Sequence, residues 1–354
     1  MFLFLSIFLF GMVAGVNATD LDGNMETNFC EPFSKACVKP DYLKPGDKVA
    51  LISPSSYVAM ERVEQTAAVL RGWGLVPVIG PNVGKKAGLN DAGTKEERLS
   101  DLRWAFSDDE VKAIICNRGG YGSIHMVPEI SLKGLASKPK WIVGFSDITT
   151  YHAMEVCAGV MSIHGTMSTF IGPNEGKDIS SLTLRDLLFG RIPEYRISPN
   201  PYNQTGKATG TLVGGNLCTF FPLLGSAIDF TNRDEGIILF IEEVGEPFHN
   251  IDRLLNMLVI TGVIDRCKGV ILGEFTDCRA DLDFESVEQM ISQYLKKYDI
   301  PVIYGFPAGH DSPNLPLVMG ATTTIEVSQT QARVSFALDG EKSVVDLTNP
   351  QPAK

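Results

Sequence analysis

Short apolar runs alternate with segments of helical character through the first half of the chain, and this alternation limits the possible folds more than any other feature. The apolar runs are 48–54, 76–79, 111–116 and 141–145, and the helix-like segments between them are 60–73 and 94–106. Such an alternation is typical of βαβ units and predicts a mainly parallel sheet. Ligands of such sheets bind beyond the carboxyl ends of the strands, so functional residues are expected there.

The second half of the chain predicts another α/β domain, with more antiparallel character. Its candidate strands are 206–213, 236–241, 269–273, 301–305, 322–327 and 332–337, and its helix-like segments are 252–259 and 284–298. The last two strands are separated by a polar turn and predict a hairpin. We expect an N-terminal extension at 19–42, domains at 43–171 and 206–347, and a polar, proline-containing connection at 172–205 with one helix-like piece, 182–189.

The charge balance argues against nucleic acid and anionic membranes as partners. The 354 residues include 31 Lys or Arg and 42 Asp or Glu, which gives a net charge of −11. Phosphate backbones and anionic lipid surfaces attract clusters of basic residues, which this chain lacks. Apolar residues make up 44% and charged residues 21% of the chain. These fractions are close to the averages of globular proteins and exclude general disorder.

The first 18 residues have the pattern of a secretory signal peptide. Residues 2–16 form an apolar run without a charged side chain, and the run is shorter than the roughly 20 residues that span a bilayer as a helix. Val16 and Ala18 lie at the −3 and −1 positions of a small-residue cleavage site. The sequence therefore predicts an exported protein that has no stable membrane association after cleavage. An uncleaved anchor is the alternative, because the α-amine of Met1 is the only positive charge before the run.

Seven cysteines show no spacing that indicates a metal site. There is no C-x-x-C pair and no Cys/His pattern of a zinc site, so neither a metal nor a cofactor is expected. Cys30 and Cys37 lie close together in the chain, and an oxidising compartment would permit a bridge between them. Cys116, Cys157 and Cys218 lie in apolar stretches and are expected to be buried as small hydrophobic residues.

A serine follows the apolar run 141–145 where a helix-like segment begins. In Gly144-Phe145-Ser146-Asp147 a sharp turn from strand to helix would project the Ser146 hydroxyl above the sheet. The next backbone N–H would then point toward a carbonyl under attack. The hydrolase motif G-x-S-x-G is half matched, because Ile148 replaces the second glycine. Local sequence favours the alternative that Ser146 only caps the helix.

A glycine-rich loop, Asn117-Arg118-Gly119-Gly120-Tyr121-Gly122-Ser123, follows the apolar run 111–116. Adjacent glycines let the backbone approach a ligand and direct N–H groups inward, as an oxyanion hole requires. The loop matches neither the P-loop pattern nor G-x-G-x-x-G, which argues against phosphate binding. An ordinary tight turn is an equally good interpretation.

Acid and base candidates occur in the second half. Glu242 and Glu243 end a buried strand, and carboxylates in such places often face a functional site, although surface salt bridges are more common. Strand alternation places the two side chains on opposite faces, so at most one points inward. His310 follows the strand-like run at 301–305, and His164 is the second candidate for a base, although a lone histidine is usually structural. These residues allow a Ser–His–Glu arrangement, but their spacing does not bring them together.

Seven segments occur in an order that resembles the LD-carboxypeptidase family of serine peptidases, which also contains the microcin C immunity peptidases. They are CNRGGYGS, IVGFSDITTYHAM, SIHGTM, GTLVGGNL, LFIEEVGEPFHNIDRLLNML, GVILGEF and IPVIYGFPAGHDSPN. The resemblance extends over about residues 43 to 345. The late family pattern N-x-x-L-P-x-G is altered, because the proline of the segment 314–320 is displaced.

The resemblance implies an α/β fold of two domains. The N-terminal domain would be a flavodoxin-like or amidotransferase-like parallel sheet, and the smaller C-terminal domain would have a β-barrel-like core. The resemblance also implies an active site between the domains, commonly in a homodimer. It assigns the nucleophile to Ser146, the base to His310 and the orienting acid to Glu242. The backbone amides of Asp147 and of a residue in the glycine loop, Gly119 or Gly120, would form the oxyanion hole.

The function that the resemblance implies is metal-independent release of the terminal D-alanine from murein tetrapeptides, which are small peptide substrates. Many bacterial relatives act in the cytoplasm, so a signal peptide suggests digestion of extracellular or foreign fragments. The second hypothesis is hydrolysis of an aminoacyl or peptidyl nucleotide. The nucleobase of such a substrate would need an aromatic surface on which to stack, and Trp73, Trp104 and Trp141 offer no clear one. The third hypothesis is a secreted protein that binds muropeptides without turnover. The presence of all three residues Ser146, Glu242 and His310 argues against it.

Overall fold

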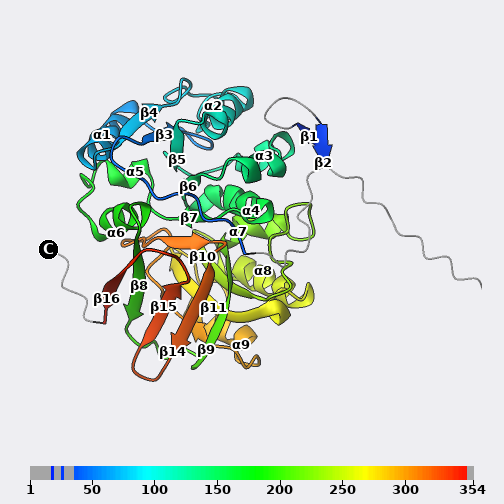
Figure 1. The fold of residues 1–354 in the computed structure, drawn as a ribbon. Coiled ribbons are helices and arrows are strands. Elements are labelled where there is room, and N and C mark those ends of the chain that lie inside the picture. The colour runs from blue at the N-terminus through cyan, green and yellow to red at the C-terminus, as the bar shows by residue number, and fades with distance from the viewer. Residues whose placement is uncertain (1–16, 20–24, 28–35, 349–354) are drawn as a thin grey trace, which may run out of the picture.

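The structure is a computed structural model that describes residues 17–19, 25–27 and 36–348. A six-stranded and an eight-stranded sheet dominate it, with helices packed around them (Figure 1). A small third sheet pairs β1 (Asn17–Thr19) with β2 (Met25–Thr27). Residues 1–16 of the expected signal peptide lie outside the described residues, so the signal peptide stays a prediction.

The six-stranded sheet contains the four strands that the alternation predicts. Its order is β13-β7-β6-β5-β3-β4, with β13 antiparallel to β7 and all other neighbours parallel. Its strands are β3 (Lys48–Ile52), β4 (Val76–Ile79), β5 (Val111–Cys116), β6 (Trp141–Gly144), β7 (Ser162–His164) and β13 (Leu317–Met319). In β3, Val49 and Leu51 belong to one apolar cluster and Ala50 and Ile52 to another. Both faces of this sheet are therefore buried, as is usual for parallel sheets.

Helices cover the six-stranded sheet, and their sequences explain their orientation. In α1 the buried residues Val63, Thr66, Ala67 and Leu70 are spaced three or four apart and form one face. The start of α2 is fixed by a capping box between Thr94 and Glu97. The helices of this half are α1 (Met60–Gly72), α2 (Lys95–Ser107), η1 (Ser123–Glu129), α3 (Leu132–Ser137), η2 (Ser146–Ile148), α4 (Thr149–Ala158) and α5 (Ser168–Ile171).

The eight-stranded sheet has the mixed character that the second half predicts. Its order is β12-β11-β10-β9-β14-β15-β8-β16. Strands β9 to β12 are parallel, β14 and β15 form the expected hairpin, and β16 runs parallel to β8. Its strands are β8 (Arg191–Ile197), β9 (Gly206–Asn216), β10 (Ile237–Val244), β11 (Cys267–Thr276), β12 (Val302–Ile303), β14 (Thr322–Val327), β15 (Ala332–Phe336) and β16 (Glu341–Leu347). The described strands form an open sheet with β12 and β16 at its edges, so the expected barrel-like core is not a closed barrel.

The helices of the second half accompany this sheet. They are α6 (Ile179–Leu188), α7 (Leu217–Phe220), η3 (Phe221–Leu223), α8 (Phe248–Ile260), η4 (Ile264–Arg266) and α9 (Val287–Leu295). Among the residues that the structure describes, no helix combines the length and the apolar character needed to span a membrane.

The segment 172–205, expected to be a connection, contains both α6 and β8. Strand β8 was missed because a proline and charged residues interrupt its apolar residues, which do not alternate strictly; its buried residues include Ile192, Tyr195 and Ile197. The strand β13 lies on the C-terminal side of His310, yet it pairs with β7 of the six-stranded sheet. A strand near the C-terminus therefore completes the first sheet. The exact domain boundaries stay a prediction.

The cysteines differ from expectation at Cys157 and Cys218. Cys37 is a free, buried thiol and forms no bridge, and Cys30 lies outside the described residues. Cys157 is disulfide-bonded rather than a simple buried hydrophobic residue. Cys116 and Cys218 are free; Cys116 is buried as expected, whereas Cys218 is only partly buried.

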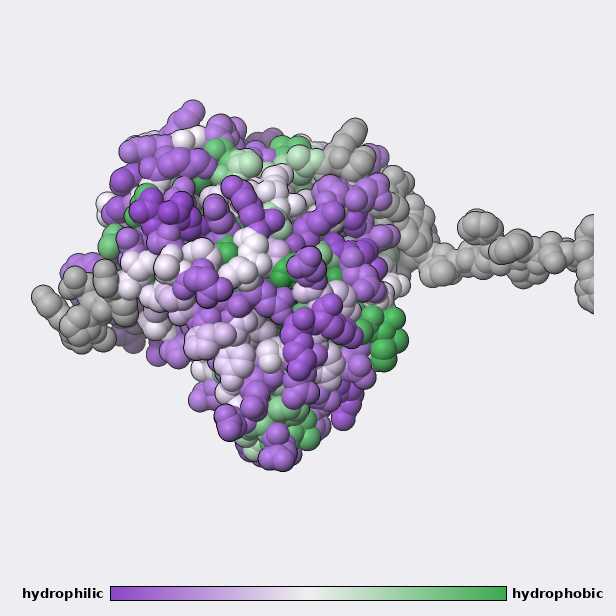
Figure 2. All heavy atoms as spheres, turned by 90° about the horizontal axis from the view of Figure 1, so that it is seen from below, coloured by the Kyte–Doolittle hydropathy of each residue, from purple (hydrophilic) through white to green (hydrophobic). Residues whose placement is uncertain are grey.

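Figure 2 views the end of the molecule at which β9 and β14 lie, and this face is mostly hydrophilic. Its hydrophobic residues occur in small separate groups. Scattered groups of this kind are normal for folded proteins and identify no interaction surface.

Candidate active site

Ser146 lies on a strained turn directly after β6. Its φ is +64°, which is uncommon for a residue with a side chain. A side chain at Gly144 would place its Cβ only 2.8 Å from Ile148 Cγ1, so glycine is required where the chain turns. Ile148 thus packs against the first glycine of the motif, and the half-matched pattern still produces a sharp strand-to-helix turn.

The hydroxyl of Ser146 is bonded to a histidine far away in the sequence. Ser146 Oγ lies 2.9 Å from His310 Nε2, and no side-chain cap is found at the start of the described helices η2 and α4. The capping interpretation of Ser146, which local sequence favours, is therefore wrong. His310 Nδ1 lies 2.7 Å from Glu242 Oε2.

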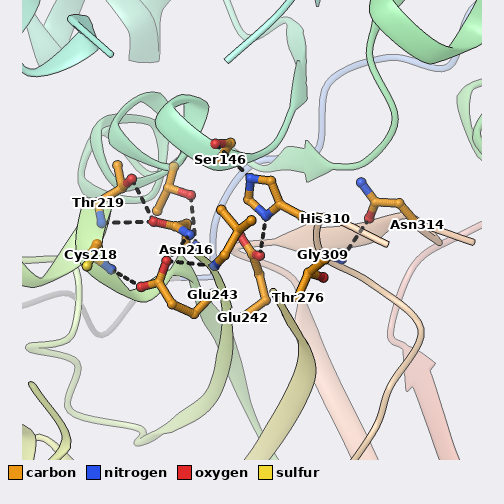
Figure 3. A network of polar contacts seen from close by, with 12 residues as sticks. Ser146, Asn216, Cys218, Thr219, Glu242, Glu243, Thr276, Gly309, His310 and Asn314 are labelled. Carbon is orange, nitrogen blue, oxygen red and sulfur yellow. Dashed lines mark hydrogen bonds and ion pairs between the residues drawn. The ribbon is translucent and has the colours of Figure 1, made fainter. Parts of the chain in front are cut away.

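These contacts connect Ser146, His310 and Glu242 in one hydrogen-bonded chain (Figure 3). Ser146 comes from the carboxyl end of β6, Glu242 from β10, and His310 from the loop after β12. The Glu242 side chain is fully buried, whereas His310 is 17% exposed. With its Nδ1–H donated to the carboxylate, the imidazole presents Nε2 as the acceptor for the serine O–H.

The neighbouring acid, Glu243, faces the other side of β10, as strand alternation predicts. Its carboxylate accepts hydrogen bonds from Asn216 Nδ2 at 2.9 Å, from Cys218 N at 2.8 Å and from Val244 N at 2.8 Å (Figure 3). Burial raises the pKa of Glu243, and these donors oppose that effect. Glu243 therefore ties β10 to the start of α7 and does not contact His310.

His164, the second candidate for a base, is buried on β7 and is not the partner of Ser146. Its ring packs edge-on against Phe240, with 4.8 Å between ring centroids, and against Phe145. Burial lowers the pKa of His164 well below its usual range, so the ring is neutral. It belongs to the packing behind the turn at Ser146.

The glycine loop lies directly on Ser146. A Cβ at Gly119 would be 2.9 Å from Ser146 Cβ, and one at Gly120 would be 2.0 Å from Ser56 Oγ. Gly120 also has a φ of +117°. Both positions therefore require glycine, and the backbone of the loop approaches the hydroxyl as an oxyanion hole would need.

The side chain of Asp147 joins this loop to the turn, a role the sequence analysis missed. Its carboxylate accepts hydrogen bonds from Ser123 N at 2.9 Å and from Ser55 Oγ at 2.6 Å. Ser55 and Ser123 are also bonded to each other through their hydroxyls, 2.8 Å apart. Asp147 thus fixes the far end of the glycine loop relative to its own backbone amide.

A cavity of about 640 Å³ opens beside Ser146. A smaller cavity of about 170 Å³ shares Phe145, Phe170 and His310 with it but is not lined by Ser146. The larger one is lined by Tyr57, Val58, Ala59, Arg62, Arg118, Gly119, Gly120, Phe145, Ser146, Met167, Thr169, Phe170 and His310. Neither arginine was assigned a role from the sequence, although Arg118 belongs to the glycine-rich loop and directly precedes Gly119.

Within the described ranges, no group of three or more His, Cys, Asp or Glu is arranged to hold a metal ion. The chemistry that the geometry supports is nucleophilic attack by an activated serine at the edge of an open cavity. The trio comes together from both sheets.

Comparisons with known proteins agree with this arrangement. A model of the LD-carboxypeptidase N-terminal domain matches residues 49–165, and a model of the C-terminal domain matches residues 209–325. A probable murein peptide carboxypeptidase of Bacillus subtilis is 32% identical over 301 residues, which cover 83% of this chain and 93% of that protein. A murein tetrapeptide carboxypeptidase of Pseudomonas aeruginosa is 30% identical over 287 residues, which cover 79% and 93%.

Solved structures show the same fold at lower identity. A muramoyltetrapeptide carboxypeptidase from Oxalobacter formigenes has a TM-score of 0.73 at 24% identity and covers 83% of this chain and 99% of its own. An MccF-like protein from Bacillus anthracis has a TM-score of 0.75 at 23% identity, with 84% and 99% covered. From both domain matches and the long alignments with curated relatives, we conclude that the chain belongs to the LD-carboxypeptidase family of serine peptidases.

Proposed function

We propose that this protein is a serine LD-carboxypeptidase that releases the C-terminal D-alanine of murein tetrapeptides. The observation that carries the proposal is the hydrogen-bonded chain from Ser146 through His310 to Glu242 beside a cavity of about 640 Å³. The substrate is inferred from the curated relatives, two of which are named as murein peptide or tetrapeptide carboxypeptidases.

In the first step Ser146 Oγ attacks the carbonyl carbon of the third residue, which has the L configuration. The serine proton passes to His310 Nε2, and the Glu242 carboxylate stabilises the resulting imidazolium. The amide of Asp147 and one amide of Gly119 or Gly120 stabilise the oxyanion. The C–N bond then breaks, the leaving D-alanine takes the proton from His310, and an acyl-enzyme remains.

In the second step a water molecule replaces D-alanine. His310 accepts a proton from the water as its oxygen attacks the acyl carbon, and the same proton returns to Ser146 Oγ when the ester bond breaks. The products are the tripeptide and the free enzyme. The same base therefore serves both halves of the reaction.

The test is D-alanine release from a purified tetrapeptide by the wild type and by Ser146→Ala. Removing the nucleophile should lower the rate by about 10⁴-fold or more, by analogy with other triads. Equal rates for both proteins would refute the assignment.

Hydrolysis of an aminoacyl or peptidyl nucleotide is the second candidate, and one observation favours it. Tyr57 and Phe170 line the cavity beside Ser146 and offer aromatic faces on which a base could stack. The tryptophans considered for this role do not line the cavity, and Trp141 is fully buried. Assaying both substrates with the same enzyme decides between the two functions.

We also propose that the chain is exported, that residues 1–18 are removed, and that the mature enzyme is a dimer without a stable membrane association. The disulfide at Cys157 supports export, because disulfides persist in oxidising compartments. A mature N-terminus at Thr19 and a dimeric mass in sedimentation are the expected results. An N-terminus at Met1 would contradict export, and a monomeric mass would contradict the dimer.

A further inference from the structure

Two arginines line the same cavity as the nucleophile. Arg62 lies on α1, and Arg118 lies at the start of the glycine loop. Each donates one hydrogen bond to a backbone carbonyl, Arg62 Nη1 to Thr169 O at 3.4 Å and Arg118 Nη1 to Tyr57 O at 3.1 Å. Neither guanidinium forms an ion pair with a carboxylate in the part of the chain that the structure describes. Both retain N–H donors for a ligand.

The two cavities beside His310 carry opposite charge. The larger cavity is lined by Arg62 and Arg118, and no Asp or Glu is among its lining residues. The smaller cavity is lined by Asp178 and Asp311, and no Lys or Arg is among its lining residues. An anionic group of a bound substrate is therefore favoured in the larger cavity and disfavoured in the smaller one.

The chemistry of a carboxypeptidase places an anion close to the nucleophile. In the terminal residue only three bonds of about 1.3–1.5 Å separate the scissile carbonyl carbon from the carboxylate carbon. The terminal carboxylate therefore lies within about 4 Å of the carbonyl under attack, and of the two cavities only the larger one is lined by Ser146. The guanidinium group presents planar, paired donors that match a carboxylate.

We propose that Arg118 and Arg62 bind the free C-terminal carboxylate of the substrate and thereby restrict cleavage to the last peptide bond. This inference rests on the proposed carboxypeptidase function. Arg118 would be the principal ligand, because it directly precedes Gly119, whose backbone lies against Ser146. Arg62 contributes the second positive charge from α1. The two side chains act as specificity-determining residues, and proton transfer remains with His310.

The experiment compares two substrates that differ only at the terminal group: the tetrapeptide with a free carboxylate and the same peptide with a C-terminal carboxamide. Release of D-alanine or D-alaninamide gives kcat/KM for the wild type, Arg118→Gln, Arg62→Gln and the double variant. Arg253→Gln is the matched control, because Arg253 is exposed on α8 and lines neither cavity. Thermal unfolding of each variant checks that the fold is intact.

The wild type and Arg253→Gln should prefer the acid over the amide by roughly 10- to 100-fold in kcat/KM, as a bidentate charge-assisted contact would give. Arg118→Gln should lose most of this preference, Arg62→Gln a smaller part, and the double variant nearly all of it. Hydrolysis of the amide should change by less than about threefold, which shows that the loop and the nucleophile still function. Equal hydrolysis of both substrates by the wild type would overturn the inference. A proportional loss on both substrates in the variants would overturn it too.

A binding measurement separates this inference from the proposed function. Calorimetric titration of Ser146→Ala with both peptides requires no turnover, and the acid should bind at least tenfold more tightly than the amide. If the wild type releases no D-alanine but this difference is present and disappears in the arginine variants, the proposed reaction fails and the carboxylate site stands. If D-alanine is released without any acid preference, the reaction stands and the carboxylate site fails.

Discussion

The two sheets hold their functional side chains in different ways. Ser146 is placed by the path of the backbone, because its φ of +64° and the close approach of Gly119 and Gly144 fix where its hydroxyl lies. His310 lies on an irregular loop after the two-residue strand β12, and its ring is held by the hydrogen bond to Glu242. Ser146 is thus positioned by the path of its own backbone, whereas the ring of His310 depends on a second side chain, Glu242.

The loop that carries His310 connects the two sheets. It begins after β12, which belongs to the eight-stranded sheet, and ends at β13, which pairs with β7 in the six-stranded sheet. Both ends of the loop are therefore anchored, each to a different sheet. This anchoring keeps His310 Nε2 within 2.9 Å of Ser146 Oγ although the two residues are 164 positions apart.

The largest loss of activity is expected when Ser146 and His310, which form the contact between the two sheets, are replaced singly or together. Ser146→Ala and His310→Ala should each lower kcat by about 10⁴- to 10⁶-fold, and the double variant should be no slower than the slower single variant. The physical reason is that the serine and the base act as one unit. Single-turnover D-alanine release measures the residual rates. Additive losses in the double variant would show that the two residues act separately.

The next effect distinguishes the two adjacent acids of β10. Glu242→Gln keeps the shape of the side chain but removes the charge that orients His310, so kcat should fall by about 10³- to 10⁴-fold with little change in stability. Glu243→Gln should leave kcat within about tenfold and lower the free energy of unfolding by roughly 1–3 kcal/mol, because an amide nitrogen replaces one of the two oxygens that accept hydrogen bonds from Asn216, Cys218 and Val244. Activity and urea unfolding of both variants give the comparison. Similar losses of activity would contradict the division of roles.

Features of this site that depend on neighbouring residues in the sequence were predictable, whereas contacts between distant residues were not. Alternation along a strand correctly placed Glu242 and Glu243 on opposite faces, because that is a local property of the backbone. The helix cap at Ser146 was the wrong local interpretation, because the partner of the hydroxyl comes from the other sheet. The convergence of the trio followed only from the family resemblance, since no spacing encodes which loops meet.

The same limit applies to the fold and the cavity. Strand β3 was predictable because its residues are apolar on both faces, whereas β8 contains a proline and charged residues without strict alternation and was assigned to a connection. The larger cavity combines α1, the glycine loop and the turn at Ser146, and Arg62 has no local pattern that links it to the nucleophile. Tertiary packing alone brings these residues together.

A smaller loss of activity is expected when the hydrogen bonds between the glycine loop and the turn at Ser146 are removed. Asp147→Ala removes the single carboxylate oxygen, Oδ2, that accepts hydrogen bonds from both Ser55 and Ser123, so the loop amides shift relative to Ser146. We expect kcat to fall by about 10- to 100-fold while KM changes little. Asp101→Ala is the control, because Asp101 is also buried and hydrogen-bonded but lies outside both cavities. A change confined to KM would contradict a positioning role for Asp147.

The smallest expected effect is a change in the free energy of unfolding, and it concerns two buried carboxyl groups, those of Glu243 and Glu155. Glu243 has three hydrogen-bond donors, whereas neither oxygen of Glu155 on α4 has a partner among the described residues. Burial raises the pKa of Glu155 well above its ordinary value of 4.5. The folded protein therefore keeps this proton at pH values at which the unfolded chain has lost it. The free energy of unfolding consequently falls as the pH rises from the ordinary value through the raised one.

Glu155→Gln should remove this dependence and stabilise the protein at pH 8 by about 1 kcal/mol or more, with a smaller gain at pH 4.5, where the wild-type carboxyl is already largely protonated. Urea unfolding of both proteins between these pH values measures the difference. Glu64→Gln is the control, because Glu64 is exposed on α1. A constant difference between Glu155→Gln and the wild type at all pH values would show that Glu155 does not titrate on unfolding. The contrast between a partnered and an unpartnered buried acid would then have to come from packing and not from charge.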